Sequence, residues 1–226
     1  MTAAAIVATL VVGLALDQGI DLWGQVITSV AVWALFLFLA TRAPVRERTA
    51  LFICIAYATA GELFLSLVWG LYSYRLENVP LFVPPGHALL FMLGMIVARH
   101  MKDSVAWIVP AVTAPYLAFA AYAGVDTFGL LLFAFFALCL LSGEARKLYA
   151  TMFGLSMLLE IYGVWLGNWR WSYVVPHLNL TSTNPPATAG AFYCLLDFLV
   201  VLTLARLDRR AGQPASIAAS DQAIRG

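Results

Sequence analysis

Three acidic residues, Glu62, Glu160 and Asp197, lie in long runs of the sequence whose apolar interiors contain no Lys or Arg. Inside a membrane an ionisable side chain costs roughly 2.5 kcal/mol or more, which makes it a functional candidate. Desolvation disfavours the charged form of a carboxyl group, and a neutral carboxylic acid in apolar surroundings is a competent general acid. We therefore expect these three residues to be catalytic groups that handle protons. The alternative is that they form hydrogen bonds that hold neighbouring helices together.

Two of these carboxylates begin the same local pattern in the two halves of the sequence. Each glutamate is followed by a glycine, two aromatic residues beside an arginine, a loop and a pair of prolines. The glycines are Gly70 and Gly167, and the arginines are Arg75 and Arg170. The repetition predicts two parallel four-helix repeats, 1–102 and 103–210, with the site at their interface. Convergence would produce the same pattern, because aromatic rings favour the membrane surface and proline favours the first turn of a helix.

Aromatic residues near both glutamates are the candidate substrate-binding groups, because the ring faces of Trp and Tyr stabilise a cation. A belt of aromatic rings at the lipid headgroups is the simpler explanation for any one of them. The candidates, with one histidine that follows the first proline pair, are Trp69, Tyr72, Tyr74, His87, Trp165, Trp169 and Trp171. The two arginines either reach up to the headgroups or pair with a carboxylate below them. No His-x-x-x-His or Glu-x-x-His spacing is present, so we expect no metal and no other cofactor.

Composition places the chain among membrane proteins. Of its 226 residues, 62% are hydrophobic and 11% are charged, whereas a soluble domain carries about a quarter charged residues. The net charge of +1 gives no reason to expect a nucleic-acid partner. We therefore expect an integral membrane protein whose surroundings are membrane lipids.

Eight apolar runs predict an all-α bundle of eight transmembrane helices. A helix needs about 20 apolar residues to cross the hydrocarbon core, and the first, fourth and sixth runs are short by that rule. The runs cover 3–20, 22–41, 50–72, 84–99, 104–123, 127–142, 147–166 and 186–206. Together they form a single transmembrane domain, 1–210, and 211–226 is expected to be a disordered cytoplasmic tail.

Positive charges in the loops predict the orientation. Eleven of the 13 Lys and Arg residues fall on one side of the eight-helix arrangement, and only Arg75 and Arg170 fall on the other. Cytoplasmic loops carry the excess of positive charge. We expect both termini to be cytoplasmic and the protein to lie in the bacterial inner (plasma) membrane.

The stretch from Glu62 to Tyr74, with Val79-Pro80 and Pro84 after it, resembles the membrane carotenoid-biosynthesis family. That family includes the carotenoid 1,2-hydratases and is related in pattern to the heterodimeric-type lycopene cyclases. Other segments resemble the same family's Gly-x-Trp-x-Trp and Pro…Asn segment, namely Gly167 to Trp171, Val175-Pro176 and Asn184 to Tyr193.

The resemblance implies cofactor-free acid chemistry on a carotenoid or other isoprenoid lipid. Glu62 or Glu160 would protonate a terminal double bond, Tyr and Trp faces would hold the tertiary carbocation, and water or an internal alkene would capture it. The residues themselves leave two alternatives open. One is a small proton-coupled transporter, in which the carboxylates cycle protons as the two halves rock. The other is a membrane assembly protein without catalytic activity.

Overall fold

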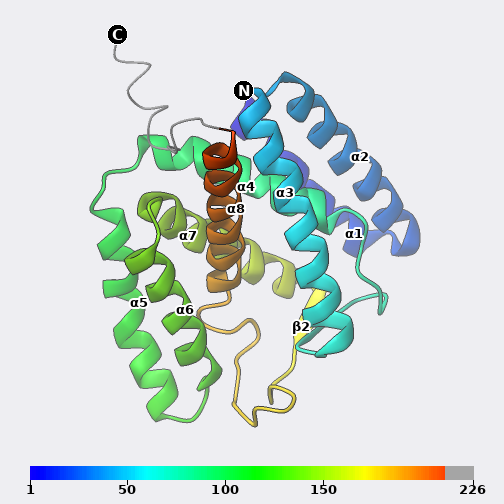
Figure 1. Ribbon diagram of the computed structural model, residues 1–226. Helices are drawn as coiled ribbons and strands as arrows, with labels where there is room; N and C mark the ends of the chain where they lie inside the picture. Colours follow the sequence, from blue (N-terminus) through cyan, green and yellow to red (C-terminus); the bar gives the residue numbers. More distant parts are fainter. Residues whose placement is uncertain (212–226) are drawn as a thin grey trace.

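The computed structural model describes residues 1–211 and is mostly helical within that range. Of the predicted tail, residues 212–226 lie outside the described part of the chain. The helices are α1 (Thr2–Gly19), α2 (Asp21–Arg42), α3 (Val45–Glu62), the π-helix η1 (Leu63–Val68), α4 (Val83–His100), α5 (Val105–Tyr122), α6 (Phe128–Ser142), α7 (Arg146–Leu166) and α8 (Gly190–Arg210). Two short strands, β1 (Tyr72–Tyr74) and β2 (Trp169–Trp171), lie in the loops (Figure 1).

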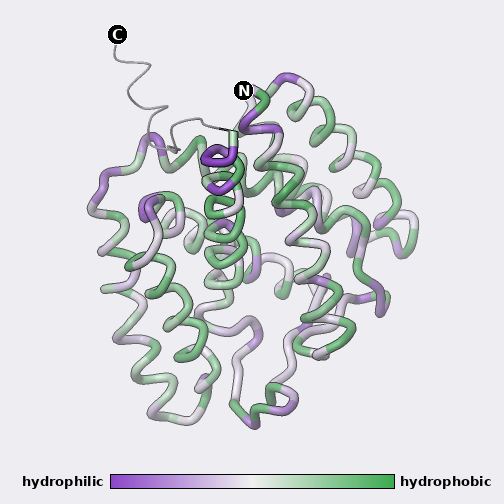
Figure 2. Tube along the Cα trace, viewed as in Figure 1, coloured by the Kyte–Doolittle hydropathy of each residue, from purple (hydrophilic) through white to green (hydrophobic). Residues whose placement is uncertain are grey.

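Six segments are long and apolar enough to cross a membrane, namely α1, α2, α3 continued by η1, α5, α7 and α8. The chain is therefore a multi-pass membrane protein. Figure 2 shows the hydrophobic residues along the middle of the bundle and hydrophilic ones near the helix ends. The prediction of eight spanning helices is supported only for these six. Helix α6 has 15 residues, which is short of the usual span, and α4 begins with prolines and ends in Arg99 and His100.

Helix α4 occupies the centre of the bundle. It packs against α3 and α7 and also contacts α1 and α2. Most of its residues from Val83 to Gly94 are buried. Because neighbouring helices enclose it, α4 meets little lipid. Helices α5 and α6 pack beside α7, and α8 packs against α3, α6 and α7 (Figure 1).

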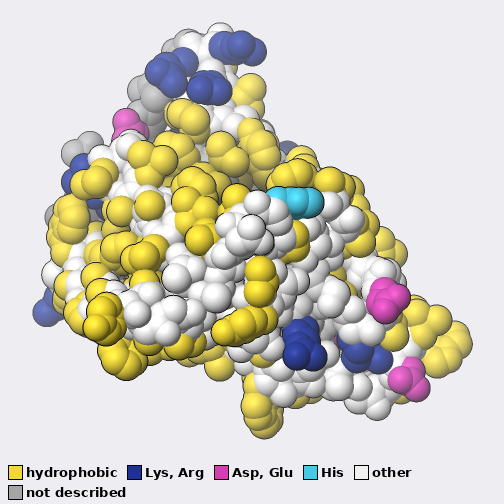
Figure 3. Space-filling view, turned by 90° about the horizontal axis from the view of Figure 1, so that it is seen from below, with side chains coloured by type: hydrophobic (Ala, Val, Ile, Leu, Met, Phe, Trp, Pro, Cys, Tyr) yellow, Lys and Arg dark blue, Asp and Glu magenta, His cyan; other side chains and the backbone are white. Residues whose placement is uncertain are grey.

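The two ends of the bundle differ in charge. Ion pairs at one end join neighbouring elements: Arg46 to Asp208 at 2.7 Å, Arg99 to Glu47 at 3.2 Å and Lys147 to Asp103 at 3.2 Å. The N-terminus and the end of α8 lie at this end (Figure 1). Figure 3 views the opposite end, where uncharged side chains dominate and charged ones are few.

The two strands pair with each other and join the two halves of the chain. They are antiparallel, and Tyr72 lies opposite Trp171 while Tyr74 lies opposite Trp169. Each strand follows a glycine in the left-handed conformation, Gly70 with a φ of 72° and Gly167 with a φ of 88°. Glycine adopts this conformation without steric cost, so it allows the chain to turn sharply at the end of a helix.

The π-helix accounts for a one-residue difference between the two halves. Gly70 is eight positions after Glu62, whereas Gly167 is seven positions after Glu160. The wider i→i+5 turn takes up one more residue than an α-helix over the same length. In η1, the Trp69 amide accordingly donates to the Phe64 carbonyl at 2.8 Å. The run predicted as one helix to residue 72 therefore changes to a π-helix after Glu62 and ends at Val68.

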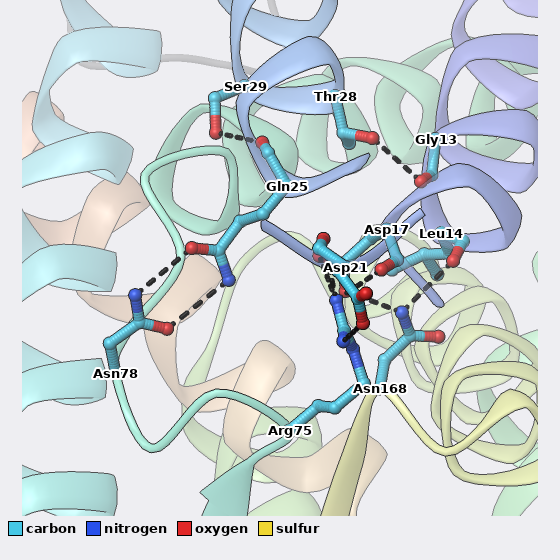
Figure 4. Close-up of polar contacts among 10 residues, drawn as sticks. All are labelled: Gly13, Leu14, Asp17, Asp21, Gln25, Thr28, Ser29, Arg75, Asn78 and Asn168. Carbon is cyan, nitrogen blue, oxygen red and sulfur yellow. Dashed lines mark hydrogen bonds and ion pairs between the residues drawn. The ribbon is translucent and has the colours of Figure 1, made fainter. Parts of the chain in front are cut away.

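A polar cluster holds the strands to the end of α1 (Figure 4). The Arg75 guanidinium lies 3.7 Å from a carboxylate oxygen of Asp17 and 3.7 Å from one of Asp21. It also donates to the backbone carbonyls of both residues. The Asn168 side-chain amide donates to Asp17 Oδ2 at 2.7 Å and to the Leu14 carbonyl at 3.0 Å. Of the two alternatives for Arg75 and Arg170, pairing with a carboxylate therefore applies to Arg75.

Candidate functional site

A cavity of about 470 Å³ lies between the central helices and the paired strands. Binding pockets in proteins commonly measure about 300–1,000 Å³, so this cavity is large enough for part of a lipid. Eight of the residues predicted for the site line it: Glu62, Trp69, Tyr72, Tyr74, His87, Glu160, Trp169 and Trp171. Both matched glutamates thus reach one shared space. None of the described residues that line it is Lys or Arg.

Glu62 lies at the junction of α3 and η1 and is held by tyrosines from β1. The hydroxyls of Tyr72 and Tyr74 each donate to Glu62 Oε2 at 2.7 Å. The other oxygen, Oε1, lies 3.5 Å from His87 Nε2. The carboxyl group is buried, so these contacts replace much of the hydrogen bonding that it would have in water.

Glu160 is held in the same way by tryptophans from β2. The indole nitrogens of Trp169 and Trp171 donate to Glu160 Oε2 at 2.8 and 3.1 Å. The hydroxyl of Tyr193 on α8 donates to Oε1 at 3.0 Å. An indole N–H can only donate, so the two tryptophans suit a carboxylate oxygen that accepts. Three donors can together compensate the charge of an ionised Glu160.

The spacing of the aromatic residues explains why both aromatic side chains of each strand donate to the same glutamate. Side chains two positions apart in a strand lie on the same face, so Tyr72 and Tyr74 both point inward, and so do Trp169 and Trp171. The residue between each pair points outward and is exposed: Ser73 in β1 and Arg170 in β2. The two strands therefore form an aromatic cap over the cavity, at the end of the bundle that holds few charges.

Gly163 allows the Trp169 ring to lie close to α7. It follows Glu160 by three positions and so lies on the same face of the helix. A Cβ atom at Gly163 would collide with the six-membered ring of Trp169. The absence of a side chain at this position is therefore a requirement for the contact between Trp169 and Glu160.

Burial raises the pKa of the Tyr72 and Tyr74 hydroxyls well above their usual value, and the neighbouring charge of Glu62 adds to the effect. Both hydroxyls therefore keep their protons at neutral pH and act as hydrogen-bond donors. The cap thus presents protonated donors to Glu62 throughout the physiological range.

Two of the predicted site residues, Trp165 and Asp197, do not line the cavity. Trp165 is 76% exposed and does not line the cavity, because five positions along a helix rotate a side chain about 140° away from Glu160. Asp197 is fully buried on α8 but is not among the residues that line the cavity. Neither of its oxygens has a hydrogen-bond partner within residues 1–211. Its catalytic role stays a prediction.

Tyr193 belongs to the site and was not predicted. Its hydroxyl contacts Glu160, and its ring stacks on His87 with centroids 4.7 Å apart and planes 7° apart. The signal in the sequence was its position four residues before Asp197, on the same face of the last apolar run. Tyr193 physically connects the surroundings of the two glutamates.

No protein-family model, curated protein or solved structure matches the chain. Function therefore has to be inferred from the geometry of the cavity and its acidic groups.

Proposed function

We propose that the protein is a membrane enzyme that carries out cofactor-free acid–base chemistry, a hydration or a cyclisation, on a carotenoid or other isoprenoid lipid. The observation that carries the proposal is that Glu62 and Glu160 reach the same apolar cavity beneath an aromatic cap. An acid in apolar surroundings suits the protonation of an alkene, because little water is present to compete for the proton. Aromatic faces and a carboxylate suit the carbocation that results.

The reaction begins when the acid transfers its proton to the terminal double bond. The π electrons form the new C–H bond, and the more substituted carbon becomes a tertiary cation. In a hydration, the oxygen of water bonds to that carbon and releases a proton to the carboxylate. In a cyclisation, an internal alkene bonds to the cation, and the ring loses a neighbouring proton to the same group. Both routes regenerate the acid, which is why neither requires a cofactor.

Some residues that line the cavity are exposed on the lipid-facing side of the bundle, which supports the proposal that the substrate is dissolved in the bilayer. Where α3 and η1 face α8, Phe64 is 52% exposed and Ala60 is also exposed. Lining residues on α8 in this region, Leu195, Leu196 and Leu199, are half-buried. These residues are apolar, so the edge of the cavity can admit a hydrocarbon chain directly from the membrane.

We further propose that the two halves are parallel repeats and that the strongly charged end faces the cytoplasm of a bacterial inner membrane. Matched glycines, matched strands and matched glutamate contacts support the repeat. The positive charges of the loops support the orientation. The accessibility of single cysteines introduced at Arg48 and Arg170 to a membrane-impermeant reagent tests it, because only the Arg170 site is expected to react from outside the cell.

The test of function is turnover by the purified protein in liposomes that contain an acyclic carotenoid or a polyprenyl hydrocarbon. Mass spectrometry should detect a product that has gained one water, or an isomer of unchanged mass with a new ring. Glu62→Gln should abolish the product but retain the fold and the co-purifying lipid. Purification with phospholipid alone and no conversion would overturn the proposal. Accumulation of a solute that collapses with the proton gradient would point to a transporter instead.

A further inference from the structure

The hydrogen bond between the His87 ring and a backbone carbonyl indicates which ring nitrogen carries a proton. Its Nδ1 is 3.0 Å from the backbone carbonyl oxygen of Val83. A carbonyl oxygen can only accept, so Nδ1 must carry the hydrogen. In a neutral imidazole, that leaves Nε2 with a lone pair and without a proton.

Nε2 faces Oε1 of Glu62 at 3.5 Å. An ionised carboxylate facing an unprotonated nitrogen would place two lone pairs against each other, which is repulsive. The contact is attractive only when one further proton lies between the two groups, either on His87 or on Glu62.

The rest of the surroundings supports this arrangement. Glu62 Oε2 is occupied by its two tyrosine donors, so Oε1 is the oxygen that remains for a transferable proton. Among the described residues, the titratable side chains that contact His87 are those of Glu62 and Tyr193. The Tyr193 hydroxyl in turn donates a hydrogen bond to Glu160. No Lys or Arg among the described lining residues competes for either carboxylate.

We propose that His87 and Glu62 together hold the proton that the enzyme transfers, and that Glu160 is the fixed negative charge that stabilises the cation. This inference rests on the proposed function and divides its chemistry between the two glutamates. The pair gives its proton to the less substituted carbon of the terminal double bond, so the more substituted carbon becomes the tertiary cation. It recovers a proton from the captured water, or from a carbon next to the cationic carbon of the new ring, so the cycle balances.

The proton can be located without any turnover. The protein is labelled with ¹⁵N-histidine, and the chain's three histidines are assigned by single His100→Gln and His177→Gln changes. In the wild type, the His87 Nε2 signal should be that of a protonated or strongly hydrogen-bonded nitrogen. In Glu62→Gln it should shift, because the acid is gone, whereas Glu160→Gln should leave it almost unchanged. A signal of a free, unprotonated Nε2 in the wild type would overturn the inference.

Turnover provides the second readout. His87→Gln and Glu62→Gln should each lower kcat by about 10²–10⁴-fold, the usual contribution of a general acid, with the co-purifying lipid retained. An active wild type with undiminished kcat in His87→Gln would overturn the role of the pair but not the proposed function. The expected NMR signals in a protein that converts no isoprenoid would instead overturn the proposed function and leave the shared proton established.

Discussion

Tyr72 and Trp171 face each other across the paired strands with ring centroids 4.7 Å apart, although they bind different carboxylates. Tyr72 donates to Glu62 and Trp171 donates to Glu160. The contact between their rings therefore joins two hydrogen-bonded acids that are far apart in the sequence. A change at either ring is expected to affect both sides of the cavity.

Trp171→Phe removes the indole N–H but keeps an aromatic ring in the cap. Glu160 Oε2 then loses one of its two donors, so we expect the free energy of unfolding to fall by about 1.5–3 kcal/mol, the range for hydrogen bonds to charged groups. Unfolding in mixed micelles measures the change. Trp165→Phe is the matched control on the exposed face of α7, where a loss above about 0.5 kcal/mol is not expected. Equal losses in both variants would show that Glu160 does not depend on the cap.

Stability should decrease at alkaline pH because of Tyr72 and Tyr74. Their pKa values are raised in the folded protein by burial, and the charge of Glu62 adds to this, whereas an unfolded tyrosine titrates near pH 10. Below that pH both states keep the protons, and the stability is fully present. Above it, only the unfolded state loses them, so the free energy of unfolding falls by about 1.4 kcal/mol per pH unit for each residue.

The measurement compares unfolding of the wild type and of Tyr72→Phe/Tyr74→Phe between about pH 9 and pH 11. The double variant should show a shallower fall than the wild type, and either single variant should lie between them. Identical slopes in all four proteins would mean that these hydroxyls ionise in the folded state as readily as in the unfolded one.

Gly163→Ala should displace the Trp169 ring. The new methyl group would occupy the position of the ring, and overpacking of this kind costs about 1–3 kcal/mol. Loss of the contact between Trp169 and Glu160 should also lower turnover. Gly154→Ala in the same helix is the control, because no atom lies within 4 Å of the added Cβ. That variant should be neutral or more stable by up to about 1 kcal/mol.

The helices could be predicted from the sequence because long apolar runs leave the chain few alternatives in a membrane. The predicted run 104–123 corresponds to α5 (Val105–Tyr122), and 147–166 corresponds to α7 (Arg146–Leu166). The placement of Glu62 and Glu160 at one cavity also follows the repeated pattern in the sequence. Their roles in catalysis stay predictions.

The paired strands could not be recognised in the same way. Each has three residues, too few for an alternating pattern to stand out from chance. The Tyr-x-Tyr and Trp-x-Trp spacing was nevertheless their signal, because residues two apart share one face of a strand. The π-helix has no sequence signature of its own. The one indication of it in the sequence was that glutamate and glycine are eight positions apart in the first half and seven in the second.

Arg75→Ala should destabilise the protein, whereas Arg170→Ala should not. The Arg75 guanidinium is partly buried and contacts Asp17, which is almost fully buried. Removing it leaves that carboxylate with Asn168 as its remaining side-chain partner, at an expected cost of about 1–3 kcal/mol. Arg170 points outward from β2 and is exposed. Adding Asp17→Asn to Arg75→Ala should recover part of the loss, because the uncompensated charge is then removed. Unfolding of the wild type, Arg75→Ala, Asp17→Asn and the double variant in mixed micelles checks this, with Arg170→Ala as the control. Additive losses in the double variant would contradict a direct coupling between Arg75 and Asp17.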